Sequence, residues 1–168
     1  TIVKLHTAPT RFVRRLLLSN QAVATYCYRD PRDVALSALD HGRRSRAGKD
    51  PTGAFANLDS FPKSLRAASK WARTFPAWQE LPNTLVIRYE DLMQRQADYL
   101  DRCARLLGIH ARDTDIAEIA DELLAEQESA WNFNKGTTER WRDELDQRNQ
   151  VKATRTLRRD LQRMGYEP

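Results

Sequence analysis

The sequence predicts an α/β protein in which helices alternate with the short strands of a parallel sheet. The first observation is an apolar, β-rich run from Val23 to Tyr28 that stops at Arg29. A turn follows at Asp30-Pro31, and then a helical pattern continues to Leu39. Two more apolar, β-branched runs, Thr1–His6 and Leu85–Tyr89, are separated from it by amphipathic helical patterns. Strands that alternate with helices in this order are typical of parallel sheets, because parallel neighbours need long crossover connections.

Capping and breaking residues place the other elements. Thr7-Ala8-Pro9 ends the first apolar run, and Pro31 suits a first helical turn because its missing N–H would have no intrahelical partner. The basic stretch from Gly42 to Gly53 is expected to be a mobile loop. The remaining helices are expected at Arg11–Ser19 after the cap Thr10, Pro31 to about Arg46, from Asp59 or Ser60 to an interruption at Phe75-Pro76, Glu90–Leu107 before Gly108, from Thr114 onward, and Arg148–Met164.

Length and composition narrow the class of protein. We expect the 168 residues to form one domain, residues 1–168, with a core of its own. The net charge of +5 suits an anionic partner and equally suits a merely soluble surface, so it decides nothing alone. No apolar run is long enough to span a bilayer, and no cluster of His, Cys and Asp suggests a metal. Cys27 and Cys103 lie in apolar patterns, which favours reduced, buried thiols in a cytoplasmic protein.

The turn after the central strand is a candidate anion site. Parallel sheets bind ligands at the carboxyl ends of their strands, where Arg29 stands, and Ser37 follows two helical turns into the next helix. The free N–H groups and the dipole of a helix start favour an anion there. The alternative is that Arg29 is simply solvated or ion-paired, and these residues alone leave both readings open.

The amino-acid sequence of this segment resembles a motif of a known family. Arg29 to Ser37 reads RDPRDVALS, which is similar to the R-N/D-P-R/K-D-V-x-x-S segment of sulfotransferases that use 3′-phosphoadenosine 5′-phosphosulfate (PAPS). The resemblance implies that Arg29 and Ser37 hold the 3′-phosphate of PAPS, or of its product adenosine 3′,5′-bisphosphate (PAP). It also implies a three-layer α/β/α sandwich around a short parallel sheet, similar to P-loop NTPases, with a helix-rich C-terminal half.

Three further segments follow the family's order. Lys4 to Pro9 matches its K-x-H-x-x-P segment, which implies that His6 is the general base and that Lys4 stabilises charge on the sulfonate or the leaving group. Leu85 to Leu92 resembles its L-x-F/I/V-x-Y-E-D-L strand, which implies that Tyr89 contacts the adenine side of the donor. The stretch from Phe133 to Arg142 resembles its R-K-G-x-x-G-D-W-K/R loop.

That last loop departs from the family pattern. Lys135 and Gly136 match, which implies that they bind the 3′-phosphate, but Asn134 replaces the family's Arg. An Asn gives one neutral hydrogen bond where Arg gives a charged fork, so either the clamp is weaker or Arg140 substitutes. The family's first strand and its T-Y-P-K-S-G-T-T phosphate loop are expected before Thr1, and the 168 residues do not contain them.

The sequence therefore predicts a sulfotransferase that moves the sulfonate group from PAPS to a hydroxyl or amine, without a metal. The acceptor is expected to be a small molecule or a glycan, with an anionic acceptor suggested by the basic loop, and the chain is expected to be inactive without the phosphate loop. A bared sheet edge would favour a homodimer. For a sulfotransferase of this kind we expect no membrane partner and no nucleic-acid partner. The alternative to this prediction is a non-catalytic module that binds a nucleotide or a nucleic acid.

Overall fold

A computed structural model of the chain describes residues 1–49, 53, 55–127 and 136–168. The chain divides into two compact units. Unit 1 contains residues 1–28 and 74–130, and unit 2 contains residues 29–73 and 131–168. None of the described helices is both long and apolar enough to cross a membrane.

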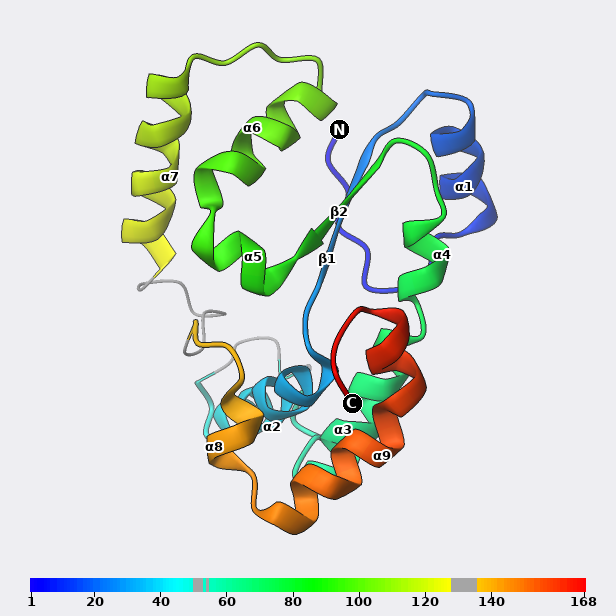
Figure 1. The fold of residues 1–168 in the computed structure, drawn as a ribbon, viewed down its shortest axis with the longest axis vertical. Coiled ribbons are helices and arrows are strands. Elements are labelled where there is room, and N and C mark those ends of the chain that lie inside the picture. The colour runs from blue at the N-terminus through cyan, green and yellow to red at the C-terminus, as the bar shows by residue number, and fades with distance from the viewer. Residues whose placement is uncertain (50–52, 54, 128–135) are drawn as a thin grey trace. The chain divides into compact units, whose positions relative to one another are not determined.

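Unit 1 is built on a parallel pair of strands, β1 (Ala24–Tyr28) and β2 (Thr84–Arg88). Ala24 pairs with Thr84 and Tyr28 with Arg88, so the two strands are in register over their whole length. In Figure 1 the pair runs between α4 on one side and α5 with α6 on the other. The helices of this unit are α1 (Arg11–Leu18), α4 (Phe75–Gln79), α5 (Tyr89–Gln94), α6 (Gln96–Leu106) and α7 (Asp113–Gln127).

The core of unit 1 lies on the α4 side of this strand pair. Leu17, Trp78 and Leu81 are buried together, and Tyr26 of β1 packs against them. The rings of Tyr26 and Trp78 are stacked, with centroids 5.8 Å apart. Burial raises the pKa of Tyr26, although the hydrogen bond between its hydroxyl and that of Thr74 (3.2 Å) opposes the shift.

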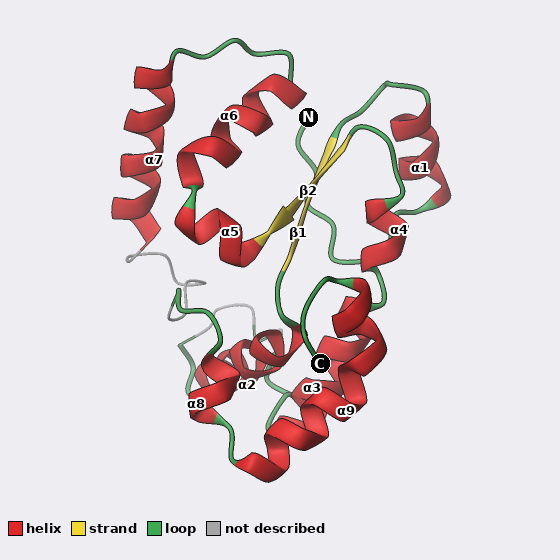
Figure 2. Ribbon diagram, viewed as in Figure 1, coloured by secondary structure: helices red, strands yellow, loops and turns green. Residues whose placement is uncertain are grey.

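Unit 2 is helical and consists of α2 (Pro31–Arg46), α3 (Phe61–Ala72), α8 (Arg140–Glu144) and α9 (Gln147–Arg163), as Figure 2 shows. The long helix α2 packs against the other three. It begins as expected, with Pro31 in its first turn and Asp30 as the N-cap. Its core side chains include Ala35, Leu36, Leu39, Leu65, Leu157 and Leu161.

The predicted α/β arrangement is confirmed, but four local predictions were wrong. Thr1–His6 forms no strand, because β-branched residues become a strand only where a neighbour pairs with them, and Ile2 is 99% exposed. The loop expected over 42–53 overlaps the last five residues of α2, Gly42–Arg46, whereas the helix end expected at about Arg46 is confirmed. The helix expected over 90–107 breaks at Arg95 into α5 and α6. Cys27 is exposed and Cys103 half-buried, because the face of β1 that carries Cys27 is not covered.

Candidate functional site

The predicted anion site lies at the start of α2, in unit 2. Arg29 follows β1 directly and precedes the N-cap Asp30, whose side chain accepts a hydrogen bond from the backbone N–H of Arg32 at 2.8 Å. This bond fixes the first turn of a 16-residue helix. The Arg29 side chain is 15% exposed, so it lies at the surface of the turn with little freedom.

Asp33 holds the turn in place from inside. Its side chain is 0% exposed, and its two carboxylate oxygens have different partners. Oδ2 accepts a hydrogen bond from Arg29 Nη2 at 3.0 Å, and Oδ1 accepts one from the backbone N–H of Trp141 at 3.0 Å. One buried carboxylate therefore ties the first turn of α2 to the start of α8.

Arg29 itself reaches the second segment of the candidate site. Its Nη2 also donates to the carbonyl oxygen of Thr137, which follows Gly136. The donor and acceptor are 108 residues apart in sequence. Two segments that the sequence analysis assigned to the same phosphate are thus adjacent in the structure.

Burial raises the pKa of the Asp33 carboxyl above its ordinary value of 3.8. The charge of Arg29 and the hydrogen bond from the backbone of Trp141 oppose this shift, and the charge of Asp30 adds to it. Desolvation of the carboxylate is thus the largest contribution. Burial therefore disfavours the ionised form of Asp33, and its two donors partly offset that cost in free energy.

A second contact joins the same two elements. The Arg32 guanidinium is buried and lies 3.8 Å from the ring centroid of Trp141. Its Nη2 donates to Asp30 Oδ2 at 2.7 Å and to the carbonyl oxygen of Glu167 at 2.9 Å. Arg32 is therefore a structural residue that braces the turn, while its neighbour Arg29 faces the candidate site.

Arg140 does not take the place of the Arg that the family has at Asn134. Its side chain is 3% exposed, and its Nη2 donates to Asp40 Oδ2 at 2.6 Å. Its Nε donates to Glu144 Oε1 at 2.9 Å, and these carboxylates raise its pKa, with the Glu144 hydrogen bond contributing most. A guanidinium so engaged links α2 to α8 and is not available to a phosphate. Asn134 itself, like Lys135, lies outside the described residues.

The other donor-site residues fall in both units. In unit 2, Ser37 is half-buried on α2, and Gly136 has a φ of +65°, a conformation that favours glycine. In unit 1, Tyr89 is the half-buried first residue of α5. Lys4 and His6 are exposed in the irregular segment before α1. Trp78 anchors the end of that segment, since its indole N–H donates to the Thr7 carbonyl at 3.1 Å.

The basic residues of the expected loop have partners within the chain. Arg43 pairs with Asp40 at 3.4 Å, and Arg46 donates to the carbonyl oxygen of Ala56 at 2.8 Å. Arg44 contacts the ring of His41. These contacts are local, so three of the four cations in this stretch have a structural explanation, and Lys49 alone is left for an acceptor.

Comparison with known proteins identifies the family. The family model described as the sulfotransferase domain matches residues 1–165. The chain belongs to the sulfotransferase family. Rat sulfotransferase 2A6 is 26% identical to this sulfotransferase over 103 residues, which are 60% of the chain and 36% of the rat protein.

Two solved structures share its fold. Retinol dehydratase, in complex with androsterone and the inactive cofactor PAP, is 20% identical, has a TM-score of 0.64, and is matched over 86% of this chain and 48% of its own. Mouse sulfotransferase SULT7A1, complexed with PAP, is 20% identical, with a TM-score of 0.66 over 86% of this chain and 60% of its own. The chain thus spans between about a third and three fifths of the length of these proteins. The α/β fold implied by the sequence is confirmed.

Asp33 is a functional residue of this sulfotransferase that was not predicted from the sequence, although it lies within the segment from Arg29 to Ser37. The signal was available, because Arg29 and Asp33 are four residues apart, the spacing at which side chains meet on a helix. The hydrogen bond from the backbone N–H of Trp141 to Asp33 joins positions 108 residues apart, and no local pattern indicates such a contact.

Among the residues that the structure describes, no three His, Cys, Asp or Glu side chains are grouped to hold a metal ion.

Proposed function

We propose that the protein to which this chain belongs transfers the sulfonate group of PAPS to a hydroxyl or amine, and that residues 1–168 form one sulfotransferase-like domain that carries the 3′-phosphate side of the donor site. The observation that carries the proposal is the hydrogen bond from Arg29 to the carbonyl of Thr137. It brings the segment after β1 beside the glycine segment before α8, and a phosphate bound there would meet residues from both. PAP in the named complexes of two neighbours supports the same donor.

The donor's 3′-phosphate is proposed to bind at the start of α2. Arg29 offers a charge-assisted hydrogen bond and Ser37 a hydroxyl. Gly136 offers a backbone N–H, and its positive φ is a conformation that glycine adopts easily. The α2 helix start adds a favourable dipole. Lys135 would add a second charge, and Tyr89 is proposed to contact the adenine.

His6 is proposed as the general base. An alcohol is a weak nucleophile at neutral pH, and an imidazole titrates close enough to neutrality to remove its proton in the transition state. The acceptor oxygen forms a bond to sulfur while the bond from sulfur to the phosphate oxygen breaks, and the hydroxyl proton passes to His6. Lys4 is proposed to stabilise the negative charge that builds on the bridging oxygen, so PAP leaves as an anion.

The acceptor class follows from the same chemistry. Androsterone and retinol appear in the names of the complexes of neighbouring structures. Small hydroxyl compounds are therefore the first acceptors to test, and glycans the second. The intramolecular partners of Arg43, Arg44 and Arg46 leave little support for an anionic acceptor at that loop.

Replacing His6 tests the proposal. In the full protein, His6→Ala should lower turnover with PAPS and a panel of alcohols and phenols by about 10² to 10⁴, while PAP still binds. His110→Ala is the matched control, since His110 is also exposed and outside helices and strands, and it should leave turnover within about twofold. Turnover that survives His6→Ala would show that another group is the base. Binding of PAP without turnover in the parent protein would favour a non-catalytic nucleotide-binding module.

A further inference from the structure

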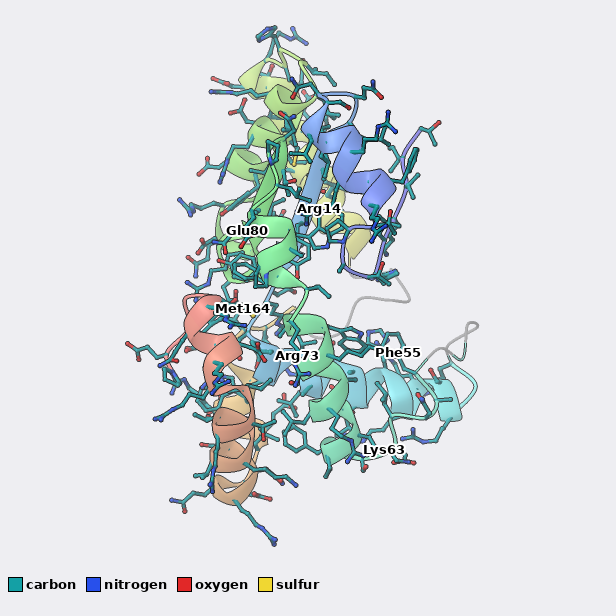
Figure 3. All side chains as sticks on the ribbon, turned by 90° about the vertical axis from the view of Figure 1, so that its right-hand side faces the viewer. Arg14, Phe55, Lys63, Arg73, Glu80 and Met164 are labelled. Atoms are coloured by element: carbon teal, nitrogen blue, oxygen red, sulfur yellow. The ribbon has the colours of Figure 1, made fainter. Side chains whose placement is uncertain are left out.

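Helix α9 carries a row of exposed basic side chains, hereafter the α9 row. Its members are spaced four, three, four and four residues apart: Arg148, Lys152, Arg155, Arg159 and Arg163. At 3.6 residues per turn this spacing keeps all five within an arc of about 80° and spreads them along about 22 Å of the helix. Figure 3 shows nitrogen-ended side chains projecting from α9 on the side away from α3.

The fold fixes the direction in which this row faces. Ala153, Leu157 and Leu161 lie on the other side of α9, and each is 0% exposed. The acidic residue of the helix, Asp160, is also buried, at 8% exposed. Among the described residues, no carboxylate lies within ion-pair distance of the five cations of the α9 row.

The charge of the chain is concentrated in the same unit. Unit 2 contains 19 basic and 11 acidic residues, a formal charge of +8, and unit 1 contains 9 basic and 12 acidic residues, a formal charge of −3. Elsewhere in unit 2 the cations of α2 and α8 are largely paired with carboxylates, as Arg140 is with Asp40 and Glu144. The α9 row contributes five of these positive charges, all exposed and without a carboxylate partner among the described residues. Arg66, Lys70 and Arg73 are likewise exposed and make no ion pair with any of those residues, but they form a shorter row of three.

We propose that the α9 row binds a linear polysaccharide that carries sulfate or carboxylate groups. A single file of cations along a straight helix matches a single file of anions. Four of the five members are Arg, whose planar fork pairs with an oxyanion more specifically than an ammonium does. The inference concerns binding alone and holds whether or not the bound chain is also the acceptor.

Other polyanions fit the α9 row less well. A helix in the groove of a duplex meets phosphates on both flanks, whereas these cations occupy one narrow arc. Single-stranded nucleic acids bind through bases stacked on aromatic side chains, and α9 contains no aromatic residue. An interfacial membrane helix inserts its apolar face, and here that face is buried in the core of unit 2.

A pair of triple variants tests the proposal. Arg148, Lys152 and Arg155 belong to the α9 row. Arg66 and Lys70 of α3 and its C-cap Arg73 repeat the same residue types and spacing. Figure 3 labels Arg73 and, near the start of α3, Lys63. R148Q/K152Q/R155Q and R66Q/K70Q/R73Q remove the same charge from the same unit and keep good helix formers at every site. Thermal melting should show both variants folded.

The probe is a size series of heparin oligosaccharides, titrated by calorimetry at fixed salt without PAPS. The α9 triple variant should bind about ten- to hundredfold more weakly than the parent, since three exposed charge pairs each contribute a factor of roughly two to five, and the α3 triple variant should bind within about twofold. Affinity should rise with oligosaccharide length until the chain spans about 22 Å.

Three results would overturn the proposal. Equal weakening by both triple variants would show that only the overall charge of unit 2 attracts the polyanion. Tighter binding of a short mixed-sequence DNA duplex than of heparin, at equal salt, would make the surface a nucleic-acid site. Binding to phosphatidylserine–phosphatidylcholine vesicles that depends on the α9 row, with no length dependence for heparin, would make it a membrane-surface site.

Discussion

At the residue scale, Asp33 shows how one side chain organises the candidate site. It is the buried acceptor for both Arg29 and the backbone of Trp141, so it sets where the Arg29 guanidinium lies. A carboxylate that satisfies two donors from inside the protein has few substitutes: an amide of the same shape accepts at one atom and donates at the other. The residue belongs to the machinery of the site without contacting the nucleotide in our proposal.

The raised pKa of Asp33 predicts a particular pH dependence of stability. A carboxyl whose folded pKa lies above its unfolded value binds its proton more tightly in the folded state. Its contribution is therefore fully present below pH 3.8 and is lost as pH rises through the folded pKa. The free energy of unfolding of the parent minus that of Asp33→Asn, from urea titrations, should fall as pH rises through this window.

Asp59 provides a control of opposite sign. It is exposed, and its hydrogen bond from Lys63 lowers its pKa. The contribution of Asp59 should be present above pH 3.8 and be lost as pH falls below it, so the parent minus Asp59→Asn difference should rise with pH. A difference for Asp33→Asn that is flat or rises with pH would contradict the burial argument.

At the element scale, the joint between α2 and α8 depends on Arg140. Arg140→Met should lower the free energy of unfolding by about 3 kcal/mol, because Asp40 and Glu144 then lose the cation between them in a largely buried place. Arg142→Met is the matched control on the same helix: its pair with Glu139 is exposed, so the loss should stay under about 1 kcal/mol. Equal losses by denaturant unfolding would show that the Arg140 cluster is not special.

Gly42 illustrates a close approach within unit 2. A Cβ there would lie 2.4 Å from the carbonyl oxygen of Leu58 and 2.8 Å from that of Phe55. Alanine in a helix interior is ordinarily favoured over glycine by about 1 kcal/mol, but here the backbone of the 55–58 segment blocks it. Gly42→Ala should therefore lower the melting temperature. An increase would show that this segment can move away from α2.

The elements themselves were largely predictable, for local reasons. Helices such as α2 and α9 are specified by their own periodicity and caps, so their bounds are close to those expected from sequence. The prediction of a strand over Thr1–His6 was wrong because a strand needs a neighbouring strand to pair with, and the residues of the run do not encode that neighbour. The predicted burial of Cys27 was wrong because the alternation of side chains along β1 indicates two faces but does not indicate which face is covered by other elements.

At the scale of the whole molecule, motifs in the family's order indicated the fold before any contact was known. The order identified which distant segments should meet, and the bond from Arg29 to Thr137 agrees with it. The order of the motifs along the chain does not indicate which hydrogen-bond and ion-pair partners each side chain has. Arg140 seemed a suitable substitute from its place in the loop, and its partner Asp40 lies 100 residues away. Ion pairs of this kind depend on tertiary packing and have to be read from the structure.

The distribution of charge is the other property of the whole chain. The two units carry opposite formal charges, which the overall value of +5 conceals. Lys49 and the three Arg of the stretch from 43 to 46 contribute to unit 2, yet the Arg side chains have local partners. Neutralising all four should therefore leave the acceptor KM and its salt dependence unchanged within about twofold. A marked rise in KM would restore that stretch as an acceptor contact.

The central claim, that the start of α2 holds the 3′-phosphate of the donor, is tested most directly by calorimetric titration of the chain with PAP and with adenosine 5′-monophosphate, which lacks that phosphate. We expect PAP to bind more tightly, and Arg29→Ala to abolish the preference by weakening PAP about ten- to hundredfold, the loss of one charge-assisted hydrogen bond. Arg73→Ala, at an exposed site directly after α3, should change neither affinity. Equal binding of the two nucleotides, or a preference that survives Arg29→Ala, would contradict the account.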